Sequence, residues 1–268
     1  GSITQNIFGS DIDLESVGNL GVITQYVDSL LISGNIFKNF KVGNNPTGIS
    51  LSTGSINTTI SNNMISGMIY TGTGGYGGKG IAINTGSLSS NLTIANNVIS
   101  NLTGDGWNTF ATDAIVGIRV TGTTGGIKLY YNSVNLFGNA DRSATATLSA
   151  ALYLIGTTGG LDIRNNVFSN SLINNLNTGS KAYAIYNAGT NASFTTINNN
   201  DYYASGVQGV LGFQTADVLT IEDWRIATGQ DANSINEVAL FTDSTNLHIP
   251  NGTITALESS GTPIAGIT

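Results

Sequence analysis

Few side chains in this 268-residue chain could do acid–base, nucleophilic or metal chemistry. The sequence contains no cysteine, which removes a disulfide framework and a thiolate metal site. Its single histidine, His248, stands before Ile249 in an expected late strand, and we interpret it as structural or solvent-facing. We find no phosphate-binding loop, no serine–histidine–aspartate set and no zinc motif. The sequence therefore predicts no catalytic residue, no bound metal and no cofactor.

One pair of charged residues deserves comparison with the needs of polysaccharide cleavage. Glycoside hydrolysis requires two carboxylates at a set separation, and that arrangement is not recognisable here. A lyase would need an arginine or lysine base near acidic groups. Asp162 and Arg164 share one face of an expected strand, and Arg119 and Lys128 are expected near them. Because the same spacing is typical of an exposed salt bridge, we favour a protein that is not an enzyme.

A short acidic run is the other candidate for ion binding. Asp11, Asp13 and Glu15 alternate along the chain and would share one face if the segment were a strand. Carboxylate oxygens are ligands for Ca²⁺. Such a run is more often a solvated face or loop, and we favour that interpretation.

Aromatic residues gather in connections that recur through the chain. The connections span Tyr70–Lys79, Thr103–Asp113, Gly138–Ser149 and Asn174–Lys181. They contain the candidate ligand-binding residues Tyr70, Tyr76, Trp107 and Phe110. Loops on a rigid scaffold commonly carry binding sites, and exposed rings are suitable platforms for sugars. The alternative is that the rings fold back and seal the side of the molecule, which we favour for Trp107 and Phe110.

The elements that position these loops follow from an internal repeat, the feature that decides fold class most directly. Seven asparagines each have an apolar or aromatic residue three places before and another two places after. They are Asn6, Asn35, Asn63, Asn97, Asn132, Asn166 and Asn200. Around Asn97, Leu92 and Ile94 alternate with polar residues as in a half-buried strand. Asparagine tolerates left-handed backbone, so the predicted local structure is a strand, a sharp bend at Asn96-Asn97 and a second strand.

A further strand precedes each bend and is followed by a Thr/Gly turn. The segments are Gly48–Leu51, Gly80–Ile83, Gly117–Val120, Ala151–Leu154 and Ala184–Tyr186, and the turns include 53–54, 85–86 and 157–160. Three short strands per repeat cannot bury their apolar faces alone, but stacked repeats can. Stacking would place the asparagines about 4.8 Å apart, where their side-chain amides form a ladder. The sequence predicts a right-handed parallel β-helix of about seven to eight coils. Flexible asparagine-rich loops are the alternative.

Composition agrees with an all-β chain and limits its partners. Charged residues make up 9% of the chain, with 35 glycines and 3 prolines, and the net charge is −7. No basic patch interleaved with aromatics is present, so nucleic acid is not expected as a partner. No apolar run approaches the length of a membrane span, so membrane insertion is not expected either.

The repeat organises the chain as a single domain over residues 1–268. Residues 1–205 are the regular coils and 206–268 are irregular coils. Within the latter, 220–228 is predicted to be a helix with Thr220 as N-cap, acids in the first turn and Gly229 as the stop. The helix either shields strand edges or decorates the side. We expect the spacing of one repeat (called a rung below) to resume at Leu247–Ile254, with Gly252 in the asparagine position. We also expect another strand at Pro263–Ile267. The first rung arrives at residue 6, so we expect an excerpt from a longer chain.

Two resemblances add a lineage to this interpretation. The body, with Ile60-Ser-Asn-Asn63 and Ile163-Arg-Asn-Asn-Val-Phe168, is similar to the parallel β-helix repeats of pectate-lyase-like proteins. The tail resembles the C-terminal part of β-helix regions in large secreted or surface proteins of Bacteroidota and related bacteria. Its matching residues are Asp223-Trp224, Ala227–Ser234, Leu240-Phe241 and Asn246–His248. The resemblance implies a secreted or cell-surface location.

The expected function is a non-catalytic structural or adhesin-type module, with polysaccharide or cell-surface glycan as a partner at the side loops. A polysaccharide lyase or glycoside hydrolase is one alternative. A subunit of an extracellular filament that associates end to end is another.

Overall fold

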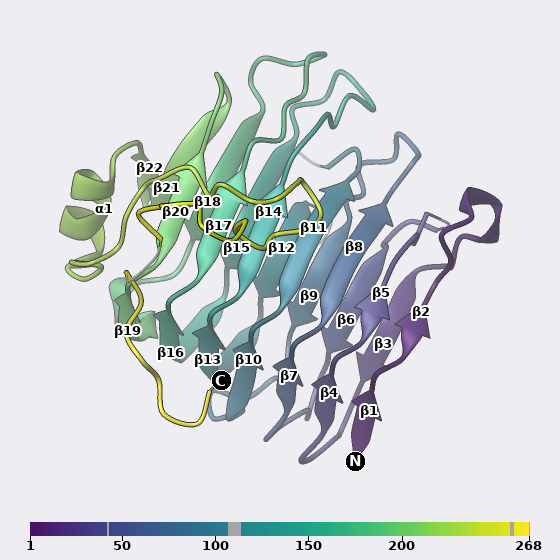
Figure 1. The fold of residues 1–268 in the computed structure, drawn as a ribbon, viewed down its shortest axis with the longest axis horizontal. Helices are drawn as coiled ribbons and strands as arrows, with labels where there is room; N and C mark the ends of the chain where they lie inside the picture. Colours follow the sequence, from purple (N-terminus) through teal and green to yellow (C-terminus); the bar gives the residue numbers. More distant parts are fainter. Residues whose placement is uncertain (42, 107–113, 258–259, 268) are drawn as a thin grey trace.

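The computed structural model describes residues 1–41, 43–106, 114–257 and 260–267, and within them the chain forms a parallel β-solenoid of three sheets (Figure 1). The first sheet contains β1 (Ser2–Thr4), β4 (Leu31–Ser33), β7 (Thr59–Ser61), β10 (Leu92–Ala95), β13 (Thr123–Tyr130), β16 (Thr157–Arg164) and β19 (Phe194–Asn198). The second contains β2 (Ile7–Phe8), β5 (Ile36–Phe37), β8 (Met64–Ile69), β11 (Val98–Thr103), β14 (Ser133–Leu136), β17 (Val167–Asn170) and β20 (Asp201–Ala204). The third contains β3 (Leu20–Thr24), β6 (Thr47–Leu51), β9 (Lys79–Ile83), β12 (Ile115–Val120), β15 (Leu148–Leu154), β18 (Lys181–Asn187), β21 (Gly209–Gln214) and β22 (Ala216–Val218). We call them sheets A, B and C.

The predicted stacking of repeats is confirmed by strand register. In sheet A the first apolar residue of each triplet pairs with its counterpart, as Ile60 does with Ile94 and Ile94 with Leu129. In sheet B the second apolar residue does the same, as Ile99 does with Val134. These residues are buried from Ile32 onward. Neighbouring strands are parallel throughout, apart from the β21–β22 pair. The alternative of flexible asparagine-rich loops is therefore wrong.

The asparagine ladder is confirmed along the whole stack. Each side-chain Nδ2 donates to Oδ1 of the next asparagine at 2.9–3.1 Å. Each main-chain N–H donates to that same Oδ1 at 3.0–3.1 Å. From Asn35 onward, a second Nδ2 bond reaches a carbonyl of the preceding coil, for example Ile94 O from Asn132. All but Asn6, which lies at the end of the stack, are buried. Every hydrogen bond between successive asparagines donates toward the C-terminal end.

A directional ladder needs an acceptor at its last rung, and Asp231 provides it. The Asn200 main-chain N–H donates to Ser234 Oγ (2.9 Å), and that hydroxyl donates to Asp231. Asn200 Nδ2 donates to Tyr202 Oη (3.1 Å), which donates to Asp231 Oδ2 (3.1 Å). An ionised carboxylate only accepts hydrogen bonds, so both donor chains can end there. Burial raises the pKa of Asp231, and these hydrogen bonds oppose that shift.

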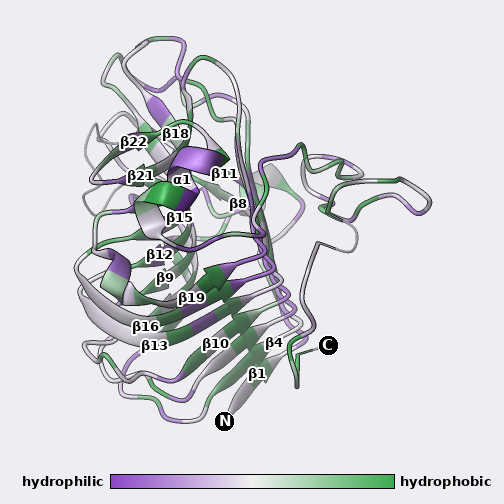
Figure 2. Cartoon of the chain, turned by 90° about the vertical axis from the view of Figure 1, so that its left-hand side faces the viewer, coloured by the Kyte–Doolittle hydropathy of each residue, from purple (hydrophilic) through white to green (hydrophobic). Residues whose placement is uncertain are grey.

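The predicted helix is confirmed as α1 (Ile221–Thr228). Thr220 Oγ1 accepts from the Asp223 N–H at 3.1 Å, and Gly229 ends the helix in the left-handed conformation. Trp224 is fully buried and donates to Asp231 at 2.8 Å. Ile226, on the same helix, is 81% exposed. Seen from its own end of the molecule, α1 lies over the last coil (Figure 2), so the helix shields strand edges.

The expected return of the rung pattern after residue 246 is wrong. No strand occurs in the described residues after β22, and Ile254 is 91% exposed. Before that point, residues 238–244 already cross the outer face of sheet B, over β20, β17 and β14 (Figure 1). Gly252 has no side-chain amide that could continue the ladder. The main-chain N–H and the Nδ2 of Asn200 already have acceptors. A further rung would therefore leave buried groups without partners.

The turn predictions are confirmed in part. Gly54 and Gly86 adopt φ of 75°, as turns after β6 and β9 require. Residues 157–160, also predicted as a turn, instead form the first half of β16, paired with β13.

Candidate functional site: side loops and aromatic faces

The side loops lie on one side of the stack, as predicted. Each leaves a strand of sheet B and enters a strand of sheet C: β8 to β9, β11 to β12, β14 to β15 and β17 to β18. Because the sheets are parallel and in register, these connections recur at the same corner of successive coils. In Figure 1 the connections from β14 to β15 and from β17 to β18 extend beyond the upper ends of the strands.

Tyr70 and Tyr76 come together in the first of these loops. Their ring centroids are 5.3 Å apart at an interplanar angle of 78°, an edge-to-face contact. Tyr70 Oη accepts from the Gly74 N–H at 3.1 Å. A Cβ on Gly72 would lie 2.3 Å from that same oxygen, so a larger residue there would displace the Tyr70 ring. Both rings are partly exposed. The pair therefore seals part of the loop and keeps part of its surface accessible.

Asp105 fixes the position of this aromatic pair. The residue is 2% exposed, and its Oδ2 accepts from the Gly75 N–H at 2.7 Å. Its Oδ1 accepts from Ser143 Oγ at 2.6 Å, and its main-chain carbonyl accepts from Thr147 Oγ1 at 2.8 Å. One carboxylate thus joins three successive side loops. The sequence places Asp105 in a loop but gives no sign of this connecting role.

A buried lysine closes the base of the same loop. Lys79 is 1% exposed and donates to Gly77 O at 3.2 Å and to Asn45 Oδ1. Buried lysines normally need such partners. Trp107 and Phe110, the other candidate ligand-binding residues, lie outside the described residues.

The outer face of sheet C carries an aromatic surface that the sequence analysis missed. In register, Tyr153 pairs with Tyr186 and Tyr186 with Phe213. The Tyr186 and Phe213 rings stack at 4.4 Å and 9°, and both are partly exposed. Tyr153 is fully buried, and burial raises its pKa. The available signal was apolar residues on both faces of Leu148–Leu154, which indicates a strand covered on both sides.

Asp162 and Arg164 form the ion pair that the sequence suggested, but both side chains are partly buried. Arg164 Nε and Nη2 donate to the two carboxylate oxygens at 2.6 and 2.7 Å, and Tyr130 Oη donates to Oδ2 at 2.6 Å. The bond to Asp162 raises the pKa of Arg164, which makes it a poor base. Lys128 is the register neighbour of Asp162 on β13, whereas Arg119 lies on β12 of another sheet. The expected grouping of all four residues is therefore wrong.

The acidic run near the N-terminus is not a strand face. Asp13–Glu15 form a single turn of 3₁₀ helix. Asp11 pairs with Lys38 at 2.6 Å, and Glu15 accepts from Ser10 at 2.7 Å. Among the residues that the structure describes, no group of three or more histidine, cysteine or acidic side chains could hold a metal. His248 is exposed and bonds Asn246 Oδ1 at 2.7 Å, but it lies outside any strand.

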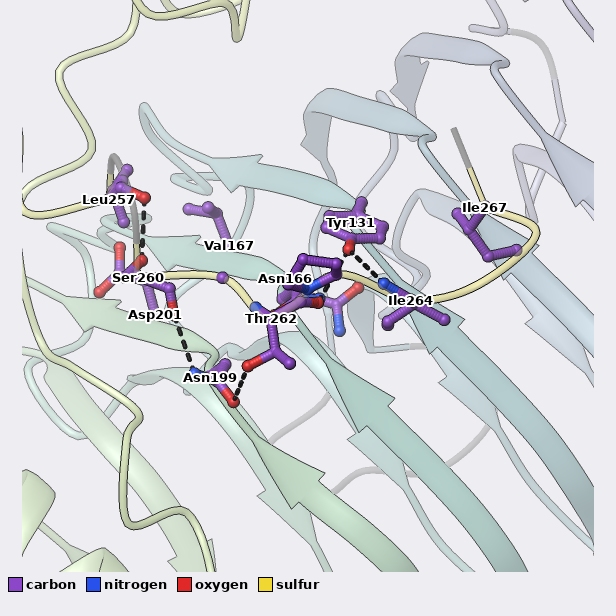
Figure 3. Close-up of a pocket in the computed structure, with 13 residues that line it drawn as sticks. Tyr131, Asn166, Val167, Asn199, Asp201, Leu257, Ser260, Thr262, Ile264 and Ile267 are labelled. Carbon is purple, nitrogen blue, oxygen red and sulfur yellow. Dashed lines mark hydrogen bonds between the residues drawn. The ribbon is translucent and has the colours of Figure 1, made fainter.

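A groove of about 480 Å³ is lined by the C-terminal segment and by the corner between sheets A and B (Figure 3). Asn165 and Asn199 line it from the solenoid, and Ser260, Thr262 and Ile264 line it from the segment. Asp201 also lines the groove, but it bonds a residue that does not line the groove. Its Oδ1 accepts from the Glu237 N–H at 2.9 Å, and its buried Oδ2 has no hydrogen-bond partner among the described residues. Burial raises the pKa of Asp201 to about 7.

No protein-family model matches the chain, and comparisons with curated proteins and with solved structures also find no match. Within the described part of the chain, no helix has the length and apolar character needed to cross a membrane.

Proposed function

We propose that this chain is a non-catalytic structural module of the adhesin type in a secreted or cell-surface bacterial protein. In this proposal it contacts polysaccharide or cell-surface glycan through its side loops. Support for a structural role comes from the ladder, which satisfies its buried amides along the stack and favours a stiff scaffold. The fully paired Asp162–Arg164 ion pair supports a role without catalysis.

The observation that carries the glycan part is the aromatic pair in the first side loop. Tyr70 and Tyr76 are partly exposed, and the loop that holds them is tied by Asp105 to the next two loops. A ring face offers flat apolar area beside polar groups. Loops fixed before binding lose little entropy when a ligand arrives. Trp107 and Phe110 remain candidate contacts from the sequence, and the Tyr186–Phe213 stack offers a second ring surface.

The finer architecture and the lineage belong to the same proposal. We infer a right-handed β-helix of about seven to eight coils, of the pectate-lyase-like kind, from a large protein of Bacteroidota or related bacteria. The sequence resemblances of the body and the tail support this part. End-to-end association into a filament is the weaker alternative, because α1 and the Asp231 network occupy the end that the next copy would cover.

Binding to a glycan array tests the proposal. We expect the full chain to bind a subset of polysaccharides. Replacing both rings (Tyr70→Ala with Tyr76→Ala) should weaken that binding by about tenfold, which corresponds to about 1.4 kcal/mol. Tyr26→Asn is the matched control, because Tyr26 is a 75% exposed tyrosine outside the side loops. Its left-handed backbone (φ 52°) suits asparagine.

Two results would contradict the proposal. One is glycan binding that survives the double replacement unchanged, which would remove the side loops as the contact. The other is release of new reducing ends or unsaturated products from polysaccharide by the full chain, which would favour a hydrolase or lyase.

A further inference from the structure

A column of left-handed residues runs along the corner between sheets A and B. Its members stand directly before the ladder asparagines and have φ between 53° and 67°. They are Gln5, Gly34, Asn62, Asn96, Tyr131, Asn165 and Asn199. We call them the corner column. Parallel stacking spaces neighbouring members by about 4.8 Å, so the column presents side chains at a regular interval along the length of the solenoid.

Residues 260–264, which we call the strap, lie on three members of this column (Figure 3). Asn199 Nδ2 donates to Ser260 O at 2.8 Å. Asn165 Nδ2 donates to Thr262 O at 2.7 Å, and its Oδ1 accepts from the Thr262 N–H at 2.9 Å. Tyr131 Oη donates to Thr262 O at 2.9 Å and accepts from the Ile264 N–H at 3.2 Å.

These contacts recognise the main chain of the strap at alternate residues. The two bonds between Asn165 and Thr262 reproduce the exchange of N–H and C=O that a neighbouring β-strand would make. One strap side chain joins in, through a bond of 3.3 Å from Thr262 Oγ1 to Asn199 Oδ1. Because the remaining bonds are to backbone atoms, the recognition depends mainly on an extended conformation and only slightly on sequence.

The geometry also leaves room for other sequences. A Cβ added to Gly261 would meet nothing closer than Asn165 Oδ1 at 3.4 Å, which is ordinary van der Waals contact. The groove of about 480 Å³ beside the strap is lined by Val167, Leu257 and Ile267 as well as by amides. Larger side chains than those of Ser260 and Gly261 can therefore be accommodated.

We propose that the corner column is a docking site for an extended polypeptide segment, recognised through its main chain, and that the strap is the segment with which this chain occupies it. The partner is an extended, uncharged peptide like the strap itself. Main-chain capture by an edge is an established mode of peptide recognition. Here the edge is made of side-chain amides. This site lies at the corner between sheets A and B and is independent of the side loops and of their proposed glycan contact.

The test uses the full chain with Thr262→Pro, which weakens the attachment of the strap. The substitution removes the N–H that donates to Asn165 Oδ1. Hydrogen exchange should show faster exchange of the Ile264 N–H, which donates to Tyr131 Oη in the original chain, and unchanged protection in β13 and β14. A labelled peptide of residues 260–267 should then bind this variant at least about tenfold more tightly than it binds the original chain. The reason is that a tethered strap competes at an effective concentration in the millimolar range.

A triple variant, Thr262→Pro with Asn165→Gly and Asn199→Gly, should lose that binding. Glycine is chosen because Gly34 holds the equivalent place in the column with φ of 67°. Asn62→Gly in the Thr262→Pro background is the matched control, since Asn62 belongs to the column but does not contact the strap. It should leave peptide affinity unchanged.

Four outcomes would overturn the proposal. The strap could stay protected in Thr262→Pro, the peptide could fail to bind that variant, or the triple variant could bind the peptide as well as the single variant does. The fourth is displacement of the labelled peptide by oligosaccharide but not by unlabelled peptide. Loss of glycan binding in the Tyr70/Tyr76 variant has no bearing on any of these measurements.

Discussion

Asn132 offers the sharpest test of the ladder, because it is fully buried in the middle of the stack. Its Oδ1 accepts from the Asn97 N–H at 3.1 Å and from Asn97 Nδ2 at 2.9 Å. Its Nδ2 donates to Asn166 Oδ1 and to Ile94 O, both at 2.9 Å. Replacement by alanine removes all four bonds. Asn166 Oδ1 keeps one donor, the main-chain N–H of residue 132.

The magnitude follows from the groups left without partners. Asn97 loses the acceptor for its main-chain N–H and for one amide hydrogen. A buried donor without a partner costs about 1–3 kcal/mol, so Asn132→Ala should reduce the free energy of unfolding by about 2–6 kcal/mol. Backbone strain adds nothing, because the left-handed residue at this bend is Tyr131.

Urea denaturation followed by circular dichroism measures this loss. The matched control is Asn135→Ala, the same change three residues later on the outward face of β14. The side chain of Asn135 makes one long bond, 3.3 Å to Ser244 O. We expect the control to change stability by no more than about 0.5 kcal/mol. Ser143→Ala in a side loop would be unsuitable as a control, because Ser143 donates to the buried Asp105. Equal urea midpoints for the two asparagine variants would refute the claim that the buried asparagine ladder stabilises the fold.

Three further predictions concern the cap, a buried acid and the close packing of sheet C. Tyr202→Phe should destabilise the fold by about 1–3 kcal/mol, because an amide hydrogen of Asn200 loses its acceptor; a thermal melt unchanged from the original chain would argue against Asp231 as the terminal acceptor. Burial raises the pKa of Asp201 from 3.8 to about 7. Between these pH values the folded state holds a proton that the unfolded state has released, so the stability of the fold is greatest below pH 3.8 and falls as pH rises toward 7. The unfolding free energy of the original chain relative to Asp201→Asn should fall by about 4 kcal/mol between pH 4 and pH 8, and parallel pH profiles of the two proteins would exclude this role. Gly117→Ala should cost about 1–3 kcal/mol, because the added Cβ would lie 2.4 Å from Val134 Cγ1 and 2.5 Å from Ala151 O; the check is a urea midpoint, and no change would mean that the strand can move aside.

Much of the fold could be predicted because the repeat is local and periodic. An asparagine between apolar residues at fixed offsets determines a bend, two inward side chains and a stacked amide. All three features are present from Asn35 to Asn200. The helix at Ile221–Thr228 was equally accessible, since its cap, its first-turn acids and its final glycine are adjacent in sequence. The same reasoning failed for Leu247–Ile254, where the apolar spacing recurs without an amide to join the ladder.

The candidate site was accessible only in outline. The recurring connections and the tyrosines Tyr70 and Tyr76 could be placed in one loop from sequence. The edge-to-face contact of these rings depends on the folded loop. The bonds from Asp105 to two neighbouring loops join residues 30 to 42 positions apart. No local pattern encodes such contacts.

The sequence by itself determined the repeating unit, because each bend and each buried position is set by residues within a few places of one another. Only the tertiary structure decided how the stack ends and what covers its surfaces. Asp231 terminates the ladder, and the strap lies on Asn165 and Asn199, since partners about 30 to 100 residues apart can meet only after the coils have stacked.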